Sequence, residues 1–508
     1  MVVVLGVTYL LAGLTGHDPW KSEDAIGLAI AHGFLTGNDW LKPTLAGDAW
    51  TEVEPLYHWL AAASARLTQG WLPFHDGARL ASGIFGGLFL TFLAGAARRF
   101  HGSDAAWGAP LLAIGTLGLL MPIHEAQPAA AVLAATTGIY WGISLLTRHP
   151  LAGALLMGAS LGATFLAGGL HALLPSLVLL LVPLLQRRWA AFAIALCLGA
   201  VTVAAWPLLL AKHDPAFFQA WWAAEFASIA PYRGFSADHT KFIGWFAWPV
   251  LFIAPWALWR ARRQLMSPEV APLVLGTIAG LAWFLAHEAK VAAILPLMPP
   301  LILLAATGAA SLRRGAANAW DWFGMMTLTI AAAFVWLGTV AMLTGWPPKL
   351  AKNASKLAPG YVADLPWPML AVAVVATLAW ILVLFRVPRS PWRVAGRWAT
   401  GVTVFWVLLA ALWVPWIDYG KTYRPVVAEL RQALPEKPGC VARRHIGASQ
   451  RAAMDYFGGI RARADDKGCR WLIVQGGQDE SKPSGWTKVW EGHRPGDTGE
   501  WLRLYRRD

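Results

Sequence analysis

The sequence predicts a polytopic α-helical membrane protein with a small α/β domain near its carboxyl end. Of 508 residues, 57% are hydrophobic and only 14% are charged, whereas soluble globular proteins carry about 25% charged residues. The mean hydropathy is +0.47, and long apolar runs recur along the chain. The composition turns polar only after about Asp418.

Apolar runs long enough to cross a bilayer number about thirteen. Their approximate centres are Leu10, Leu88, Leu112, Gly138, Leu161, Leu179, Leu198, Leu251, Ala279, Leu301, Ala332, Val375 and Leu408. The chain has 31 Trp residues. Many of them stand near the ends of these runs, as in the aromatic belts of membrane proteins.

Arginine clusters occupy every second loop between the apolar runs, and the intervening loops hold far fewer arginines. The positive-inside rule then makes the arginine loops cytoplasmic. An odd number of spans places the N-terminus inside and the C-terminal region outside. The net charge of +13 is explained by this orientation, so no nucleic-acid partner is expected. The predicted division is a membrane domain, 1–417, with an outer loop, 17–77, and an outer domain, 418–508.

The polar region 418–508 reads as a small α/β domain. A helix is predicted at 426–434, strands begin near Cys440 and Cys469, and a hairpin is predicted from Thr487 to Tyr505. If this region is outside, the two cysteines can form a disulfide. The region contains no P-loop, no dinucleotide-binding glycine motif and no metal-ligand spacing, so we interpret it as a cap or partner surface.

The most informative segment is the outer loop after the first apolar run, which is rich in acidic residues. Ser22 is a candidate helix cap, and Glu23 and Asp24 fall in the first turn of a predicted helix over 23–34. Two interpretations are open. The carboxylates could simply complement the helix dipole, or one of them could point into a cavity as a general base or orient an acceptor.

This loop resembles the opening of the GT-C membrane glycosyltransferases. The similarity rests on Trp20-Lys-Ser-Glu-Asp24, on 37–47 (Gly-Asn-Asp-Trp-Leu-Lys-Pro-Thr-Leu-Ala-Gly), and on 51–60 (Thr-Glu-Val-Glu-Pro-Leu-Tyr-His-Trp-Leu). It is closest to the aminoarabinose transferase branch, which is related to protein O-mannosyltransferases. A weaker similarity covers 295–304. The resemblance implies a polyprenyl-phosphate sugar donor, for which bacteria usually use undecaprenyl phosphate, and a site on the periplasmic face of a bacterial inner membrane.

Several positions depart from the pattern of that branch. Glu23 stands where the family has a catalytic Asp, because the usual Asp-Glu pair is inverted, so either Glu23 or Asp24 could be the working acid. The family's Glu-Lys pair is Glu52-Val53, and the following Pro is Glu54. The lost lysine would have neutralised a phosphate or carboxylate. These departures argue against aminoarabinose and lipid A as the particular substrates.

A donor phosphate requires cations near the outer membrane surface. Lys241 is the best placed and Lys290 the next, with Arg233 and Lys42 as weaker candidates. The resemblance also favours His239, and Tyr57 could line the phosphate site. The alternative for each cation is snorkelling towards lipid headgroups.

A second set of side chains could bind substrate or a divalent metal, because His and carboxylate oxygens are suitable ligands. The candidates are Glu52, Glu54, His58 and His239. No local spacing among them demands a metal. His124, Glu125 and His171 end apolar runs on the same side and are interpreted as interfacial groups.

The predicted function is transfer of a sugar from a polyprenyl-phosphate donor to a lipid, glycan or protein acceptor. Glu23 or Asp24 would act on the acceptor, and a one-step displacement would invert the anomeric carbon. The alternatives are a lipid-linked-sugar transporter and an envelope assembly scaffold. A transporter predicts charges at span centres and inverted repeats, and the sequence shows neither.

Overall fold

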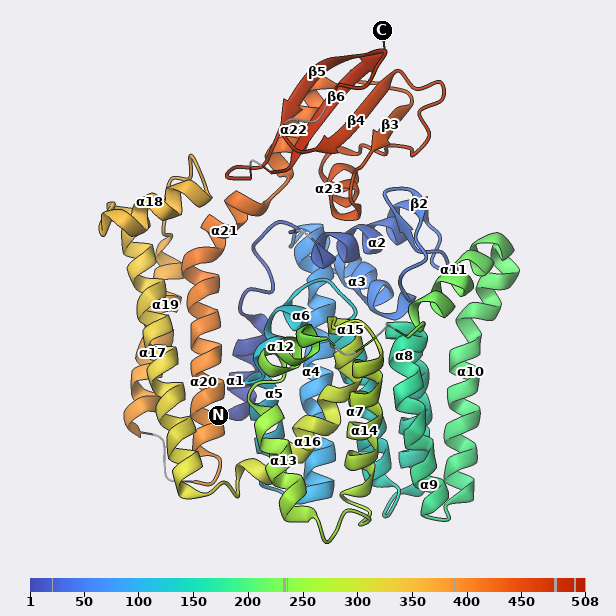
Figure 1. Ribbon diagram of the computed structural model, residues 1–508, viewed down its shortest axis with the longest axis vertical. Helices are drawn as coiled ribbons and strands as arrows, with labels where there is room; N and C mark the ends of the chain where they lie inside the picture. The colour runs from blue at the N-terminus through green and yellow to red at the C-terminus, as the bar shows by residue number, and fades with distance from the viewer. Residues whose placement is uncertain are drawn as a thin grey trace.

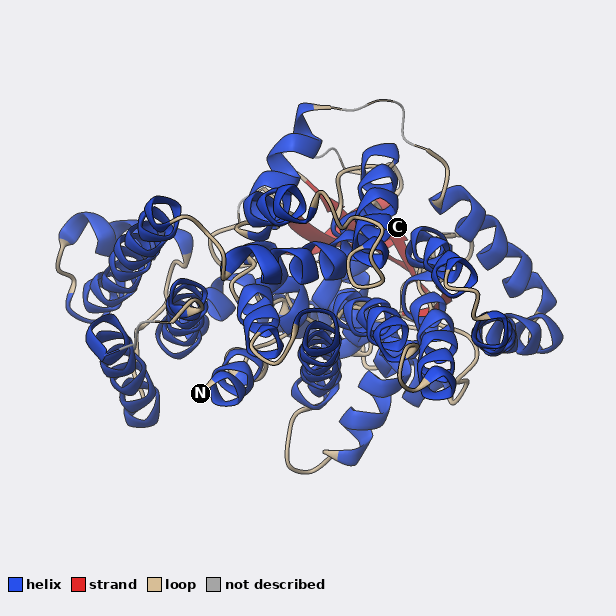
Figure 2. Ribbon diagram, turned by 90° about the horizontal axis from the view of Figure 1, so that it is seen from below, coloured by secondary structure: helices blue, strands red, loops and turns tan. Residues whose placement is uncertain are grey.

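A computed structural model shows a bundle of roughly parallel helices with a mixed α/β domain at one end (Figure 1). The structure describes residues 1–20, 22–231, 234, 236–386, 390–478, 482–497 and 499–507. Seen from below, the helices form a broad layer with the strands behind them (Figure 2).

The first part of the chain enters the bundle and then crosses its end next to the sheet domain (Figure 1). Its elements are α1 (Val2–Leu11), α2 (Glu23–Gly37), the hairpin β1 (Thr44–Leu45) and β2 (Asp48–Ala49), and α3 (Pro55–Leu67). The predicted helix over 23–34 is thus α2, but the Ser22 side chain does not cap it. Instead the carboxylate of Asp24 accepts a hydrogen bond from the Trp20 amide at 3.3 Å.

The next helices form the centre of the bundle. They are α4 (Phe74–His101), α5 (Ala105–Ile114), α6 (Leu120–His124), α7 (Ala129–Leu145), α8 (Pro150–Leu177), α9 (Leu181–Leu185) and α10 (Trp189–His213). Two single 3₁₀ turns, Leu117–Leu119 and Val178–Leu180, link α5 to α6 and α8 to α9. The α5–α6 unit bends by 67°. This bend places the loop after α6 beside the first turn of α2, where the Ala126 amide bonds Asp24.

The helical run containing α8 reverses direction at Gly168 and Gly169, whose backbone angles are not helical. Gly158 lies against Ala195 and Gly162 lies against Thr202. The first half of α8 and the whole of α10 therefore run in the same direction, so the residues between them must return across the bundle. Gly169 has a φ of +59°, a conformation that glycine adopts without strain. The separate predicted runs centred on Leu161 and Leu179 correspond to these two arms.

The following elements complete the bundle. They are α11 (Pro215–Ser228), α12 (Ala237–Phe246), α13 (Val250–Ala261), α14 (Ala271–Ala286), α15 (Val291–Ile294) and α16 (Met298–Ala309), with a 3₁₀ turn at Leu295–Leu297. Then come α17 (Arg314–Thr344), α18 (Pro348–Leu357), α19 (Trp367–Arg386), α20 (Arg393–Leu408), a π turn (Leu409–Trp413) and α21 (Val414–Lys421). Asp321 of α17 bonds Arg393 and Arg397 of α20, each at 2.8 Å, and ties these two helices together.

Within the described residues, seven helices are long and apolar enough to cross a membrane, or nine if each of two bent pairs counts as one span. Three shorter apolar helices lie beside them. Val201, Ile330 and Val375 expose more than 60% of their surface. Apolar side chains that face outward on long helices require lipid around them. The polytopic helical membrane architecture is confirmed. The count of thirteen spans stays a prediction, although all thirteen predicted centres lie in helical turns.

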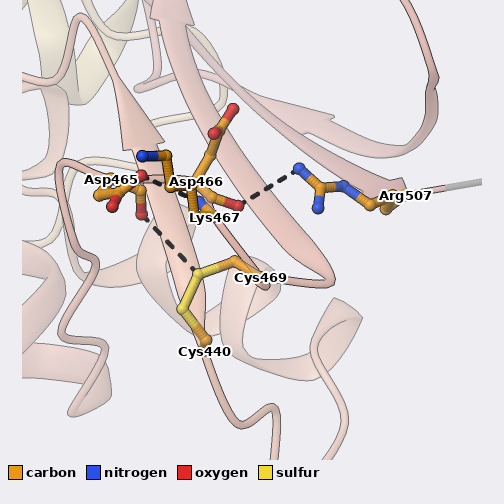
Figure 3. The surroundings of a disulfide bond; sticks show 6 residues. All are labelled: Cys440, Asp465, Asp466, Lys467, Cys469 and Arg507. Atoms are coloured by element: carbon orange, nitrogen blue, oxygen red, sulfur yellow. Dashed lines mark hydrogen bonds between the residues drawn. A yellow bond between two sulfur atoms is a disulfide. The ribbon is translucent and has the colours of Figure 1, made fainter.

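The sheet domain contains α22 (Arg424–Ala433), β3 (Val441–Arg444), α23 (Ala448–Gly458), β4 (Trp471–Gly476), β5 (Trp486–Gly492) and β6 (Trp501–Arg507). The strand order is β3-β4-β6-β5, with β3 parallel to β4 and the other pairs antiparallel. The predicted helix, strands and hairpin are present. The possible disulfide between Cys440 and Cys469 is formed as well, next to the loop that carries Asp465 (Figure 3).

Candidate active site

Asp24 and Arg79 form a buried ion pair between α2 and α4. Arg79 Nε donates to Asp24 Oδ1 at 3.0 Å and Arg79 Nη2 donates to Oδ2 at 2.7 Å. The backbone amide of Ala126 donates to Oδ1 at 2.8 Å. Both residues are essentially inaccessible to solvent. Asp24 is therefore fully committed to holding three segments together, and its oxygens are not available to a substrate.

The charge state of Asp24 agrees with this role. Burial alone would raise the pKa of its carboxyl, but the charge and hydrogen bonds of Arg79 outweigh burial and hold the pKa below its usual value. Arg79 also donates to the carbonyl oxygens of His17, at 2.8 Å, and Asp18, at 3.1 Å. One guanidinium thus fixes the loop that precedes α2 as well as its first turn.

Glu23, the neighbour of Asp24, has the opposite environment. Its side chain reaches the surface, although partial burial raises the pKa of its carboxyl, as does the nearby charge of Glu52. Lys290, at the start of α15, lies close enough to oppose that rise. Lys290 Nζ also contacts Glu288 Oε2 at 2.7 Å. The fold therefore gathers Glu23, Glu52 and Lys290 from three separate segments onto one accessible surface.

Glu125 lies in the loop after α6 and joins this acidic group. Burial, followed by the charge of Asp24, raises the pKa of its carboxyl to about 7, and a hydrogen bond from Gln127 opposes the rise. Gly27 of α2 packs so close to this loop that a Cβ atom at position 27 would stand 1.7 Å from the Ala126 oxygen. The sequence alone predicts an interfacial role for Glu125 and does not reveal its place among these carboxylates. An acidic residue at the end of an apolar run was the available signal.

Comparison with known proteins identifies the overall architecture. The sequence matches no protein-family model. It is 27% identical over 440 residues to an undecaprenyl phosphate-α-4-amino-4-deoxy-L-arabinose arabinosyl transferase of Pseudomonas paraeruginosa, covering 81% of this chain and 74% of that relative. It is 26% identical over 454 residues to the protein of the same name from Serratia proteamaculans, covering 82% of this chain and 76% of that relative.

Two solved structures extend the comparison to the fold. ArnT from Cupriavidus metallidurans, bound to undecaprenyl phosphate, aligns with a TM-score of 0.73 at 16% identity, over 99% of this chain and 97% of that one. The chain is ArnT-like in sequence and has the fold of ArnT. The apo oligosaccharyltransferase of Archaeoglobus fulgidus aligns less closely, with a TM-score of 0.53 at 11% identity, over 91% of this chain and 64% of that one.

Glu54 does not lie on the accessible surface of this ArnT-like protein. It is buried beside Glu225 of α11, and both carboxyls crowd the helix break at Gly169. Burial, followed by the charge of Glu225, raises the pKa of Glu54 well above its usual value. Glu225 accepts a hydrogen bond from the Leu170 amide at 2.8 Å. The two carboxyls therefore lie together in a packed position where α3, α8 and α11 meet.

Tyr57 and His58 of α3 are also buried. The Tyr57 hydroxyl bonds the Ser82 hydroxyl at 2.8 Å, and Ser82 donates to the Glu125 carbonyl at 2.6 Å. Burial lowers the pKa of the His58 imidazole to about 4, which keeps the ring neutral. Both side chains support the loop that carries Glu125 and the helix that carries Glu23. Their predicted contact with substrate stays a prediction.

The remaining predicted candidates have partners of their own. Lys241 is exposed and its Nζ lies 3.5 Å from Asp238 one turn away. His239 is buried, and its Nε2 donates to the His287 carbonyl at 2.8 Å. Lys42 contacts Asp214 at 2.6 Å and thereby links the outer loop to α11. Arg233 lies outside the described residues.

The four residues predicted as possible metal ligands are not brought together. Glu52 is exposed, while Glu54, His58 and His239 are buried in different surroundings. Across the described part of the chain, no group of three or more His, Cys, Asp or Glu side chains is arranged to hold a metal ion. The geometry therefore assigns no metal ligands here.

Proposed function

We propose that this protein transfers a sugar from a polyprenyl-phosphate donor to an acceptor hydroxyl or amine at the outer face of the bacterial inner membrane. The ArnT-like fold supports the donor class, because a relative of this fold is bound to undecaprenyl phosphate. The roles are assigned from the different surroundings of two neighbouring carboxylates. Asp24 is buried and hydrogen-bonded by Arg79, whereas Glu23 is accessible.

In the proposed reaction the acceptor heteroatom attacks the anomeric carbon while the bond from that carbon to the phosphate oxygen breaks. Glu23 takes the acceptor proton as general base, and its raised pKa brings it closer to neutral pH, where such a base works best. The bonding electrons leave with polyprenyl phosphate, and Lys290 stabilises its negative charge. A single displacement of this kind inverts the anomeric carbon.

Glu125 adds another carboxyl to the proposed site beside Glu23. A carboxyl with a pKa near 7 holds a proton in part of the population at neutral pH, so it can donate a hydrogen bond as well as accept one. We assign it to orienting the acceptor or the sugar. Glu52 shares the same surface and its negative charge favours a proton on Glu23. Lys290 is preferred to Lys241 because the charge of Lys290 is close enough to lower the pKa of Glu23.

The orientation of the protein is part of the proposal. The sheet domain, α2 and α3 lie at one end of the bundle (Figure 1), and the arginine-rich loops belong to the other end by the positive-inside rule. We propose that the N-terminus is cytoplasmic and that the sheet domain and the site are periplasmic. Cysteine labelling of residue 23 and of residue 467 in intact cells with a membrane-impermeant reagent tests this. Labelling only after cell lysis would contradict it.

The deciding experiment uses the purified full-length protein. It is mixed with polyprenyl-phosphate sugars extracted from its source membranes, and free polyprenyl phosphate is measured by mass spectrometry. We expect release that depends on acceptor-containing membrane extract and is lost in Glu23→Gln. No release in any extract would contradict the transferase function. A missing sugar mass on lipids, glycans or proteins of a deletion strain would identify the acceptor.

A further inference from the structure

Helix α18 carries a basic surface that the proposed reaction does not use. Lys349, Lys352 and Lys356 recur at spacings of three and four residues, so they share one face of the helix. All three are exposed. No acidic residue occurs within α18, and no ion pair to these lysines is present among the described residues. Three like charges on one exposed face repel one another. An anionic partner would lower their electrostatic free energy.

The position of α18 indicates what that partner is. The helix connects the membrane-length helices α17 and α19 and lies across their ends, on the side of the sheet domain (Figure 1). Trp346 and Trp367 flank it with 64% and 75% of their surface exposed. Tryptophans at such positions mark the level of the lipid headgroups. Lysines at that level are within reach of lipid phosphates.

The other face of α18 agrees with an interfacial location. Leu350 and Ala354 are partly buried, and Trp416 of α21 donates to the Ala354 carbonyl at 3.2 Å. Leu357 exposes 64% of its surface. The helix is therefore amphipathic, with its apolar side against the bundle and the bilayer and its lysines towards the headgroups, as in helices that lie in a membrane interface.

We propose that the lysine face of α18 binds the phosphate groups of anionic lipids at the membrane surface. The inference is independent of the transferase function, because it uses none of the residues assigned to catalysis. It predicts a preference for lipids with a net negative headgroup over zwitterionic lipids of the same chain length. Binding should weaken as salt rises, because exposed charges are screened within about 10 Å at 0.1 M ionic strength.

The test is native mass spectrometry of the detergent-purified full-length protein, titrated with phosphatidylglycerol or with phosphatidylcholine. The variant K349Q/K352Q/K356Q should lose preferential retention of phosphatidylglycerol, by about fivefold for each lysine. K349R/K352R/K356R should keep it. A matched control, K437Q/K467Q/K488Q, removes three exposed lysines from the sheet domain and should also keep it.

Three outcomes would overturn the proposal. The first is a wild-type protein that retains both lipids equally. The second is an equal loss of retention in the α18 and control variants, which would indicate a non-specific charge effect. The third is complete displacement of phosphatidylglycerol by about 10 mM inorganic phosphate but not by sodium chloride of the same ionic strength, because the face would then be a site for free phosphate and not for lipid.

Discussion

Glu23 and Asp24 are adjacent in the chain, yet they occupy opposite environments. The carboxylate of Asp24 is buried and accepts four hydrogen bonds, two of them from Arg79. The carboxylate of Glu23 is accessible and has a raised pKa. The helical rotation of about 100° between consecutive residues places one towards the bundle and the other towards the outside. The two neighbouring acids thus separate into a buried member that holds segments together and an accessible member.

The first prediction separates these two roles. Glu23→Gln should lower the transfer rate by about 100-fold or more, because it removes the proposed base, and should leave thermal unfolding unchanged. Asp24→Asn should lower the unfolding temperature, because it leaves the Arg79 charge buried without its partner, at a cost of about 3–5 kcal/mol. Transfer assays and unfolding curves in the same detergent check both. A stable, inactive Asp24→Asn would reverse the assignment.

The second prediction concerns the buried pair of Glu54 and Glu225. The folded-state pKa of Glu54 is raised above its unfolded value, so the folded state binds more protons than the unfolded state in the intervening pH range. Its contribution to stability is present at low pH and is lost as pH rises through the folded pKa. Glu54→Gln, which mimics the neutral form, should reduce the loss of stability with rising pH. Unfolding temperatures from pH 5 to pH 9 measure it, and an unchanged slope would contradict it.

At the scale of helices and loops, close backbone contacts build the site. Helix α2 meets the loop after α6 at Gly27, and the chain turns back at Gly168–Gly169 beside Glu54 and Glu225. Side chains at these positions would push the segments apart. The acidic surface therefore depends on small residues as much as on the charged ones that form it.

The third prediction tests the contact at Gly27. Gly27→Ala would place a methyl group 1.7 Å from the Ala126 oxygen, so α2 must shift and Glu23 must move away from Glu125. We expect loss of transfer and a lower unfolding temperature. Gly37→Ala on the same helix is the control, since no atom lies within 4 Å of the added carbon. Equal behaviour of the two variants would show that the approach at Gly27 is not required.

At the scale of the whole molecule, charged pairs dock the sheet domain on the outer loop. Arg443 and Arg451 contact Asp48 at 2.8 Å and 2.7 Å. Asp18 pairs with Arg424 and accepts a hydrogen bond from Thr422 at 2.7 Å. A cavity of about 610 Å³ lies between the loop and the domain, lined in part by Asp18, His75 and Tyr456. It shares no lining residue with the surface that holds Glu23.

The fourth prediction addresses this docking. Asp48→Asn removes the charge that faces two arginines, so the hairpin β1–β2 and α23 should exchange backbone hydrogens faster. Hydrogen–deuterium exchange of the full-length protein measures this. Glu436→Gln, at an exposed position of the same domain, should leave exchange unchanged. Unaltered exchange in Asp48→Asn would mean that the apolar contacts alone hold the domain.

Much of the architecture could be predicted from the sequence because each feature is local. Apolar runs located the helices, and the change in composition near Asp418 located the sheet domain. The partners within the site could not be predicted in this way. Arg79 lies 55 residues from Asp24 in the second turn of a long helix. Glu54 and Glu225 lie 171 residues apart in the chain and meet at the break in α8. Periodicity specifies which face a residue occupies, not which distant residue it meets.

The bond between Arg424 and Asp18 joins positions 406 residues apart. Proteins are made from the N-terminus onward, so the ribosome delivers the first outer loop long before the arginine that completes it. All the intervening helices are made before that bond can form. A prematurely terminated product would therefore leave Asp18 without its arginine partner, and docking of the sheet domain on this loop would wait for the last steps of translation.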